Sequence, residues 1–378
     1  MINKNVKKSL AFTTVILFIG ICFIPVSESI EMKRSCGILG NARGNTLYVG
    51  GSGGQNFSTI QEAIDAAIGG DIVFVYDDSS PYQENIRINK QILVTGENRD
   101  TTIISGITGQ DHVVRISSKN AEINGFTIIG AAGAQDGIAV YPLMEDSFIS
   151  NNIIKDSSYG IFLQATSTRI TIMDNMILDN EYEGIILQES DRNVISGNTI
   201  SGNGDFGIAL ETISKQNEIL DNTVEDNFAG IQLAGGSSQN TINNNNIFNN
   251  DREGILIEGV LSTTNEILGN NITGNNAGIK ITSGGKNIIK SNNFKDSNME
   301  GLYLVISNEN IIEMNNFINN RRNAGFIASF RNTWDANYWD DWIGIIFDIP
   351  LFKMFPKCIR GIALRSYDMN PQEEPYIL

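Results

Sequence analysis

The sequence predicts an all-β fold, a single-stranded right-handed parallel β-helix of about 11 coils with about 22–25 residues each. Three observations predict it. A glycine followed by an apolar residue recurs every 23 or 24 residues from Gly137-Ile138 to Gly325-Phe326. Between these markers, apolar and polar residues alternate over three to five positions, which is the period of a β-strand. Asparagines recur in phase with the glycines, at Asn152, Asn175, Asn198, Asn222, Asn246, Asn271, Asn293 and Asn316.

One repeat unit shows why strands are expected rather than helices. Residues 193–210 are a run of short alternating segments with Asn or Gly at each corner, and their β-branched residues favour strands. We expect stacked isoleucines to fill the interior, because one coil cannot bury its apolar side chains alone. The recurring asparagines are expected to take left-handed backbone angles and to hydrogen-bond between coils. The recurring glycines are expected at turns with positive φ.

The N-terminal residues resemble an export signal. Three lysines precede an apolar run from Leu10 to Val26, and small polar residues at 27–29 provide a cleavage region. Residues 1–29 are therefore predicted to be a signal peptide, and 30–45 a linker. The alternative is an uncleaved anchor, because the run nearly reaches the roughly 17 residues of a short membrane span. We expect an exported protein, in an extracellular, cell-surface or periplasm-like space, that contacts membrane only through an uncleaved N-terminal segment.

The solenoid is predicted to span residues 46–340, with regular repeats over 112–340. Ser58 can cap an amphipathic helix over 58–68 that would cover the N-terminal end of the core. The period is lost after residue 340, so residues 341–378 are predicted to form a C-terminal cap or tail over the last strand edges. The apolar face of the helix is expected to contain Ile60, Ala63, Ile64, Ala67 and Ile68.

The net charge restricts the classes of binding partner, and the positions of the cysteines bear on disulfide formation. The net charge is −16, with 43 acidic and 27 basic residues, so nucleic acid is not expected as a partner. Cations and neutral sugars are compatible with this charge. Removal of the signal would leave Cys36 and Cys358. Their positions at opposite ends of a long solenoid argue against a disulfide.

Several segments resemble known β-helix proteins. Residues 58–67, 70–71, 82–86 and 96–104 resemble the opening of pectinesterase-like and NosD-like proteins. The later coils resemble the NosD-like (periplasmic copper-binding) family, within the carbohydrate-binding and sugar-hydrolase β-helix group. The ending Asn337–Trp342 resembles archaeal surface proteins of that group. The resemblance implies a parallel β-helix and an accessory role in metal or transporter assembly, but no catalytic residue, because the repeats specify coils rather than chemistry.

Two glutamates are candidate catalytic residues. Glu211 and Glu258 occupy equivalent outward positions of the repeat, in line with Gln164 and Gln188, but Ala234 interrupts the row. A retaining pair of carboxyl groups must stand about 5 Å apart, and no two neighbouring coils both place a carboxylate in this row. The alternative is that these are solvated surface acids. The same holds for a second row just before the recurring glycines, which contains Glu183 and Glu253.

Aromatic residues near one turn form a candidate ligand-binding ledge. Their rings can stack on sugar rings while nearby polar side chains bond the hydroxyl groups. The alternative is an aromatic stack that only stabilises the turns. The aromatic residues, one or two positions before successive glycines, are Tyr159, Tyr182, Phe206 and Phe228, and the polar neighbours are Gln164, Gln188 and Glu211.

The sequence supplies few metal ligands. His112 is the only histidine, and copper requires clustered Cys, Met or His, so copper binding is not expected. His112 is interpreted as a structural residue, and Met173 and Met176 as packing residues. No cofactor is required. Calcium is compatible with the acidic residues Asp335, Asp340 and Asp341, although capping and hydrogen bonding explain them as well.

Three functions remain open from the sequence. The first is non-catalytic binding of a carbohydrate or of an envelope protein along the solenoid face. The alternative is a polysaccharide lyase or glycoside hydrolase with an acidic groove. The third is the accessory role that the resemblance implies. The enzyme requires converging carboxylates, or a carboxylate beside a basic residue, whereas the binding protein requires an aromatic ledge without that cluster.

Overall fold

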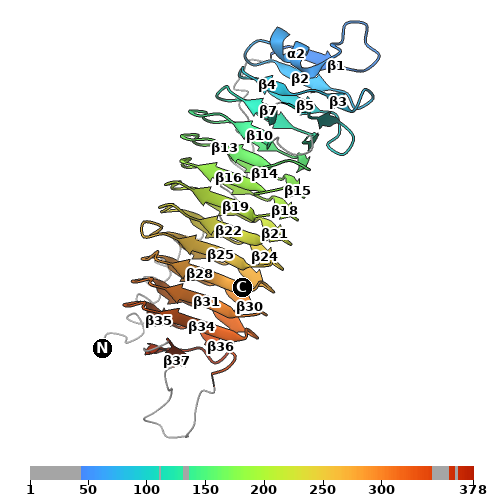
Figure 1. The fold of residues 1–378 in the computed structure, drawn as a ribbon. Helices are drawn as coiled ribbons and strands as arrows, with labels where there is room; N and C mark the ends of the chain where they lie inside the picture. The colour runs from blue at the N-terminus through green and yellow to red at the C-terminus, as the bar shows by residue number, and fades with distance from the viewer. Residues whose placement is uncertain (1–43, 110–111, 131–135, 343–356, 362–364) are drawn as a thin grey trace, which may run out of the picture. The chain divides into compact units, whose positions relative to one another are not determined.

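The computed structural model describes residues 44–109, 112–130, 136–342, 357–361 and 365–378, and it is a parallel β-helix (Figure 1). Each coil contributes one strand to each of three sheets, called A, B and C here. Sheet B has 12 strands and sheet C has 11, close to the predicted number of about 11 coils. The predicted signal peptide, and the linker up to residue 43, lie outside the described residues.

Sheet A contains 15 strands in spatial order. They are β1 Thr46–Val49, β2 Ile72–Val75, β5 Leu93–Gly96, β8 Glu122–Asn124, β11 Phe148–Ser150, β14 Thr171–Met173, β17 Val194–Ser196, β20 Glu218–Leu220, β23 Thr241–Asn243, β26 Glu266–Leu268, β29 Ile288–Lys290, β32 Ile311–Glu313, β35 Thr333–Asp335, β38 Arg365–Asp368 and β37 Lys357–Arg360.

Sheet B follows sheet A within each coil. Its strands are β3 Tyr82–Gln83, β6 Ile103–Ser105, β9 Thr127–Ile129, β12 Ile153–Lys155, β15 Met176–Leu178, β18 Thr199–Ser201, β21 Thr223–Glu225, β24 Asn246–Phe248, β27 Asn271–Thr273, β30 Asn293–Lys295, β33 Asn316–Ile318 and β36 Tyr338–Trp339.

Sheet C closes each coil. Its strands are β4 Ile86–Ile88, β7 His112–Ile116, β10 Asp136–Val140, β13 Ile161–Leu163, β16 Ile185–Gln188, β19 Phe206–Glu211, β22 Ala229–Leu233, β25 Glu253–Glu258, β28 Ala277–Thr282, β31 Glu300–Val305 and β34 Arg322–Ile327. Strand pairs are parallel throughout the coils, and β37 pairs with β38 in the antiparallel sense.

Columns of apolar side chains fill the interior, as predicted. Ile172 pairs in register with Ile195 in sheet A, and both are fully buried. Burial of one such side chain stabilises the fold by about 1.5–3 kcal/mol. Toward the C-terminal end the sheet B column becomes aromatic. There, Phe317 stacks between Phe294 and Trp339, with ring centroids 4.7 and 4.3 Å away.

A ladder of buried asparagines runs along the turn between sheets A and B. Asn222 Oδ1 accepts from the backbone N–H and the Nδ2 of Asn198, at 3.0 and 2.9 Å. The predicted amide bonds between coils are therefore present. Connected in the same way are Asn152, Asn175, Asn198, Asn222, Asn245, Asn270, Asn292, Asn315 and Asn337.

The predicted asparagine series is out of register by one residue from Asn246 onward. Asn245 is fully buried in the ladder, whereas Asn246 starts β24 with an exposed side chain. Residues 243–246 are four consecutive asparagines. Composition cannot tell which member of such a run points inward, because the pairing register decides it.

Two expectations about the turns are wrong. The left-handed residue is not the ladder asparagine but the one before it, such as Gly197 with φ of 65° before Asn198. The recurring glycines do not adopt positive φ either. A Cβ on Gly184 would stand 2.7 Å from both the carbonyl oxygen of Gly207 and Cγ2 of Ile200. Glycine is therefore required there by the close approach of the next coil.

Helix α2 lies at the N-terminal end of the stack (Figure 1). It spans Ile60–Ala66, shorter than the predicted 58–68, and its N-cap is Thr59 rather than Ser58. The helix ends too early to bury Ile68, which is 66% exposed. The helical residues that it does bury are Ile60, Ala63 and Ile64.

Two charged side chains from the coil below hold both ends of α2. The Glu84 carboxylate accepts from the N–H groups of Ile60 and Gln61, at 2.8 and 3.0 Å. Lys90 Nζ donates to the carbonyls of Asp65 and Ala67, each at 2.7 Å. A negative charge at the first turn and a positive charge at the last also match the helix dipole.

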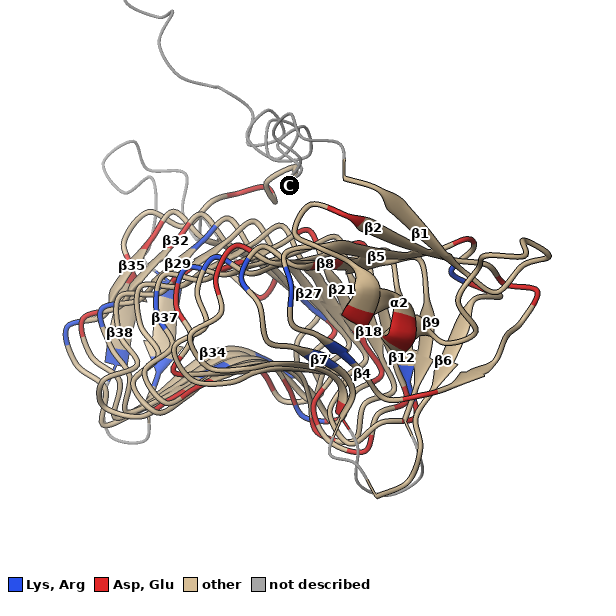
Figure 2. Cartoon of the chain, turned by 90° about the horizontal axis from the view of Figure 1, so that it is seen from above, with Lys and Arg blue, Asp and Glu red and all other residues tan. Residues whose placement is uncertain are grey.

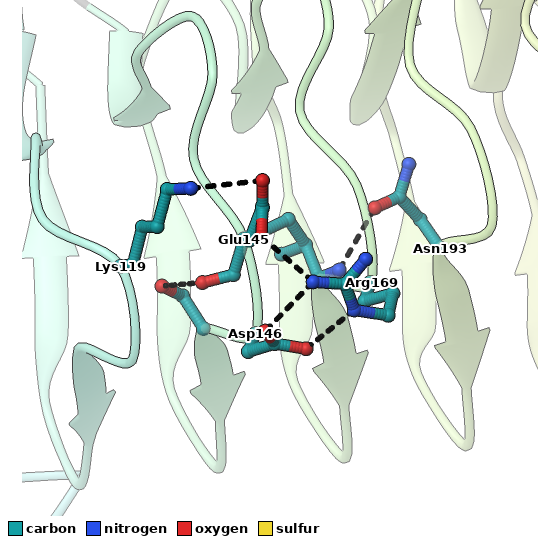
Figure 3. Close-up of polar contacts among 7 residues, drawn as sticks. Lys119, Glu145, Asp146, Arg169 and Asn193 are labelled. Atoms are coloured by element: carbon teal, nitrogen blue, oxygen red, sulfur yellow. Dashed lines mark hydrogen bonds and ion pairs between the residues drawn. The ribbon is translucent and has the colours of Figure 1, made fainter.

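An ionic clamp joins three coils at the turn between sheets C and A (Figure 3). Arg169 donates to Asp146 Oδ1 at 2.7 Å and to Glu145 Oε2 at 2.8 Å, while Lys119 donates to Glu145 Oε1 at 2.9 Å. The hydrogen bonds from Lys119 and Arg169 lower the pKa of Glu145, and that from Arg169 lowers the pKa of Asp146. Because the four side chains are exposed, we expect only a small, salt-dependent stabilisation.

The C-terminal strand closes the asparagine ladder. Asp368 Oδ2, fully buried on β38, accepts from the backbone N–H and Nδ2 of Asn337 and from Nε1 of Trp339, each at 3.0 Å. This carboxylate takes the place that the next asparagine would fill. Within the predicted cap, residues 341–378, the structure describes the strands β37 and β38, and β38 pairs with β35 of the last coil. Cys358 is half-buried on β37, and Cys36 lies outside the described residues.

Candidate functional site

The outward face of sheet C carries three rows of side chains that follow the strand register. The middle row contains alanines and Ile186 that are buried although they do not belong to the interior core. The leading row consists of His112, Asp136, Tyr159, Glu183, Phe206, Ala229 and Glu253. The middle row consists of Arg115, Ala139, Phe162, Ile186, Ala209 and Gln232. The trailing row consists of Tyr141, Gln164, Gln188, Glu211, Ala234 and Glu258.

The predicted trailing row is in register. Gln188 pairs with Glu211, and its Nε2 donates to Glu211 Oε2 at 3.4 Å. Glu258 instead accepts from Nε2 of Gln232 at 2.9 Å. Because the Ala234 coil lies between them, the backbones of Glu211 and Glu258 are about 10 Å apart, twice the strand spacing. The carboxyl groups of a retaining pair stand about 5 Å apart, which is half of that backbone separation.

Only two of the predicted aromatic residues form a ring pair with each other. The rings of Tyr159 and Tyr182 lie 5.4 Å apart, and Tyr159 also packs 5.6 Å from Phe162. Phe228 lies instead beneath the guanidinium of Arg252, at 5.6 Å. The four residues do not share one row, because Tyr159 and Phe206 lie in the leading row while Tyr182 and Phe228 lie one residue before it.

Carboxylates surround the tyrosine pair. Glu183, next to Tyr159 in the leading row, is only 8% exposed. Burial raises the pKa of Glu183 to about 7, and the negative charges of Asp205 and Glu211 contribute to the rise. Burial also raises the pKa of Asp205. Near neutral pH, Glu183 therefore exchanges between a hydrogen-bond donor and a negatively charged acceptor.

His112 is the first residue of β7, in the early coil where the sequence placed it. It lies at the start of the leading row, and its Nδ1 is 2.8 Å from Asp136 Oδ2. The hydroxyl of Tyr141, in the trailing row, is 3.4 Å from His112 Nε2. The Arg115 guanidinium stacks over the Tyr141 ring, 3.4 Å from its centroid. The one signal in the sequence was the 24-residue spacing of His112 and Asp136, which is one coil.

The residues predicted as calcium ligands are hydrogen-bonded to donors of the protein. Asp335 accepts from Nδ2 of Asn370. Asp340 and Asp341 share the Nδ2 of Asn323, and Asp341 also pairs with Lys357. No group of three His, Cys, Asp or Glu side chains among the described residues is close enough to hold a metal ion.

Copper does not fit the side chains that the structure places on this face. Both ring nitrogens of His112 already face partners of the protein, Asp136 and Tyr141. Cys358 lies on β37, at the other end of the stack. Soft metals need several His, Cys or Met ligands around one point, and His112 is the sole histidine of the sequence.

Acidic residues are spread over the turns of many coils in the view down the stack (Figure 2). Because the acidic residues are spread in this way, charge alone does not single out a binding face.

Among the described residues, no helix is long and apolar enough to cross a membrane.

Comparison with known proteins supports the fold. The sequence matches the family described as periplasmic copper-binding protein (NosD) over residues 64–254 and 206–344. No curated protein sequence matches significantly. The structure is similar to the A-module of the mannuronan C-5 epimerase AlgE6 of Azotobacter vinelandii, with a TM-score of 0.63 and 17% identity over 74% of this chain and 88% of that one.

Two further structures share the β-helix. A DFA-IIIase from Arthrobacter chlorophenolicus has a TM-score of 0.60 and 12% identity, over 77% of this chain and 94% of that one. The Dettilon tailspike protein has a TM-score of 0.55 and 17% identity, over 76% of this chain and 68% of that one. At these identities the similarity shows the fold alone.

Proposed function

Because this chain belongs to the NosD family, described as periplasmic copper-binding proteins, we propose that it is an exported β-helix protein that binds a polysaccharide along the outward face of sheet C. The ligand is proposed from the side chains of that face. Copper is not part of the proposal, because the ligand set does not fit it.

One observation carries the proposal: the tyrosine pair lies beside a row of amides and carboxylates. Tyr182 is 45% exposed and packs against Tyr159, which fixes the orientation of both rings. Gln188 ends β16, the strand that follows Tyr182, and it pairs in register with Glu211 of the next coil in the trailing row. Aromatic faces stack on sugar rings, and flanking amides and carboxylates bond hydroxyl groups. The repeat extends this chemistry along the coils, which suits a linear polymer.

The fold neighbours support a polysaccharide as the ligand. Their names include mannuronan C-5 epimerases, which act on a polysaccharide, and a phage tailspike protein. Only the class of ligand, a polysaccharide, is inferred from these neighbours. An envelope protein partner, the other form of the binding hypothesis, has no comparable observation in its favour.

A glycan array and a polysaccharide-binding screen of the full chain, with and without calcium, test the proposal. We expect binding to at least one polysaccharide, and a loss of affinity of up to about tenfold in Tyr182→Ala, because one stacked ring contributes about 0.5–1.5 kcal/mol. Phe330→Ala is the control, since Phe330 is 54% exposed and lies on a distant turn. Equal affinities for wild type and Tyr182→Ala would contradict the proposed site.

A further inference from the structure

Three side chains at the N-terminal end of the same face are arranged as a proton relay. Asp136 and His112 pair in register on neighbouring strands of sheet C, and their carboxylate and imidazole are in hydrogen-bond contact at 2.8 Å. Tyr141 is 3.4 Å from the other imidazole nitrogen. The imidazole and the carboxylate are nearly buried, with 12% of the His112 side chain and 11% of the Asp136 side chain exposed.

The order of groups matches that of a nucleophile or base activated by histidine. A carboxylate that accepts from Nδ1–H fixes the tautomer of the imidazole, and leaves Nε2 as the acceptor for the hydroxyl. A distance of 3.4 Å is long for a hydrogen bond, but such contacts tighten when substrate is bound. In a mere packing role, the histidine would not need to align both nitrogens with an acid and a hydroxyl.

Two arginines add positive charge to the same corner of an otherwise acidic protein. Arg115 stacks on Tyr141 and pairs in register with Arg87 of the preceding coil. None of the ion pairs among the described residues involves either arginine. Arg115 Nε is buried without a hydrogen-bond partner, which costs free energy unless a ligand accepts from this side chain. Carboxylates are among the ligands that guanidinium groups bind most strongly, through two parallel hydrogen bonds.

We propose that Tyr141, His112 and Asp136 form an acid–base catalytic centre that acts on a polyuronate, a polysaccharide whose sugars carry carboxylates. The proposal rests on the proposed function, in that the chain bound along sheet C passes this centre. Arg115 and Arg87 hold the sugar carboxylate. Tyr141 is the catalytic residue that meets the substrate, and Asp136 is a positioning residue that acts through His112.

The chemistry is a β-elimination. The proton on the carbon next to the carboxylate is acidified by that group, and Tyr141 Oη takes it while passing its own proton to His112 Nε2. The electron pair of the broken C–H bond forms a C=C bond, and the bond from the neighbouring carbon to the glycosidic oxygen breaks. The relay returns the proton to the leaving oxygen. Atoms and charge balance, and no oxidant or other co-reactant is consumed.

The test is to incubate the full chain with polygalacturonate and with polymannuronate and to follow unsaturated chain ends by ultraviolet absorbance. We expect turnover of at least one polymer, and a fall of at least about 100-fold in Tyr141→Phe and His112→Gln, the size of a general acid–base contribution. Tyr141→Phe keeps the ring under Arg115, and its melting temperature checks that the fold is intact. Asp136→Asn should lower kcat with KM unchanged.

The outcomes separate this proposal from the binding function. Absence of unsaturated ends with both polymers overturns the catalytic centre, even where wild type binds them. Turnover that survives in Tyr141→Phe with a folded protein overturns the assignment of the residues. Loss of binding in Tyr182→Ala without loss of turnover on short uronate oligomers would support the centre and the binding site as separate parts of one face.

Discussion

At the scale of single residues, buried asparagine amides connect the coils through hydrogen bonds. Asn245 donates from its backbone N–H and Nδ2 to Asn270, and accepts from Asn222 on the other side. Every amide of the ladder is therefore both donor and acceptor. A missing member would leave buried donors on the neighbouring coil without partners, which costs about 1–3 kcal/mol per group.

The first prediction compares two adjacent asparagines. Asn245→Ala should lower the free energy of unfolding by about 3 kcal/mol, because Asn222 loses the acceptor of two buried N–H groups. Asn246→Ala, the matched control, should change it by less than about 0.5 kcal/mol, since its side chain is exposed. Urea denaturation of both variants measures the difference, and similar values for both would contradict the register described for this turn.

The second prediction concerns Glu183, whose pKa is raised to about 7 by burial. The folded protein holds this proton more tightly than the unfolded chain. The neutral form therefore stabilises the fold fully below about pH 4.5, and this contribution is lost as pH rises through about 7. Glu183→Gln should remove the part of this pH dependence that Glu183 contributes, and raise stability at pH 8 by up to about 3 kcal/mol. Thermal unfolding at pH 5 and pH 8 tests this; the same loss of stability between the two pH values in wild type and variant would contradict it.

At the scale of elements, helix α2 depends on the coil below it more than on its own seven residues. A helix of two turns is marginal by itself, and Glu84 and Lys90 satisfy the terminal groups that it cannot bond internally. The helix is thus held as part of the first coils rather than as a separate element.

The third prediction follows from this clamp. Lys90→Met should destabilise the N-terminal coils by about 1–2 kcal/mol, because the last carbonyls of α2 lose their charged donor. Hydrogen exchange should become faster in residues 60–67 before it changes in the central coils. Lys155→Met is the control, since Lys155 is partly exposed and pairs only with its neighbour Asp156, at 3.6 Å. Unchanged exchange in α2 would show that Lys90 does not hold the helix.

At the scale of the whole molecule, each coil contacts only its neighbours, so a defect at one end has a limited range. The buried Asp368 closes the open end of the asparagine ladder. Sheet edges without such a cover expose unpaired strand groups and favour association between molecules.

The fourth prediction is that Asp368→Ala frays the C-terminal end alone. Asn337 and Trp339 lose the acceptor of three buried N–H groups, so hydrogen exchange should accelerate in β33 to β38. Strands near Ile195 should keep their protection, because nearest-neighbour coupling weakens over several coils. Mass spectrometry of exchanged peptides measures both regions, and uniform acceleration would argue against this limited coupling.

The regular repeat made the architecture predictable, but not every register within it. The interior isoleucines follow from alternation alone, because each strand has the same period. The ladder from Asn245 onward does not, because adjacent asparagines are chemically identical and only the pairing distinguishes them. Among the candidate site residues, the alignment of Gln188 with Glu211 was readable from spacing. The ring pair of Tyr159 with Tyr182 and the contact of Phe228 with Arg252 were not, because spacing does not fix side-chain conformation.

The sequence by itself determined the β-helix, its approximate number of coils and the two ends that differ from the middle. These features follow from the sequence repeat and from where it ends, and both can be read along the chain without knowing which residues meet in space. Only the tertiary structure brought Tyr141 and Asp136 to His112, positions 29 and 24 residues along the chain. It also buried Glu183 enough to move its pKa. Such contacts arise from the stacking of coils, since the environment of a polar side chain is set by the coils above and below it.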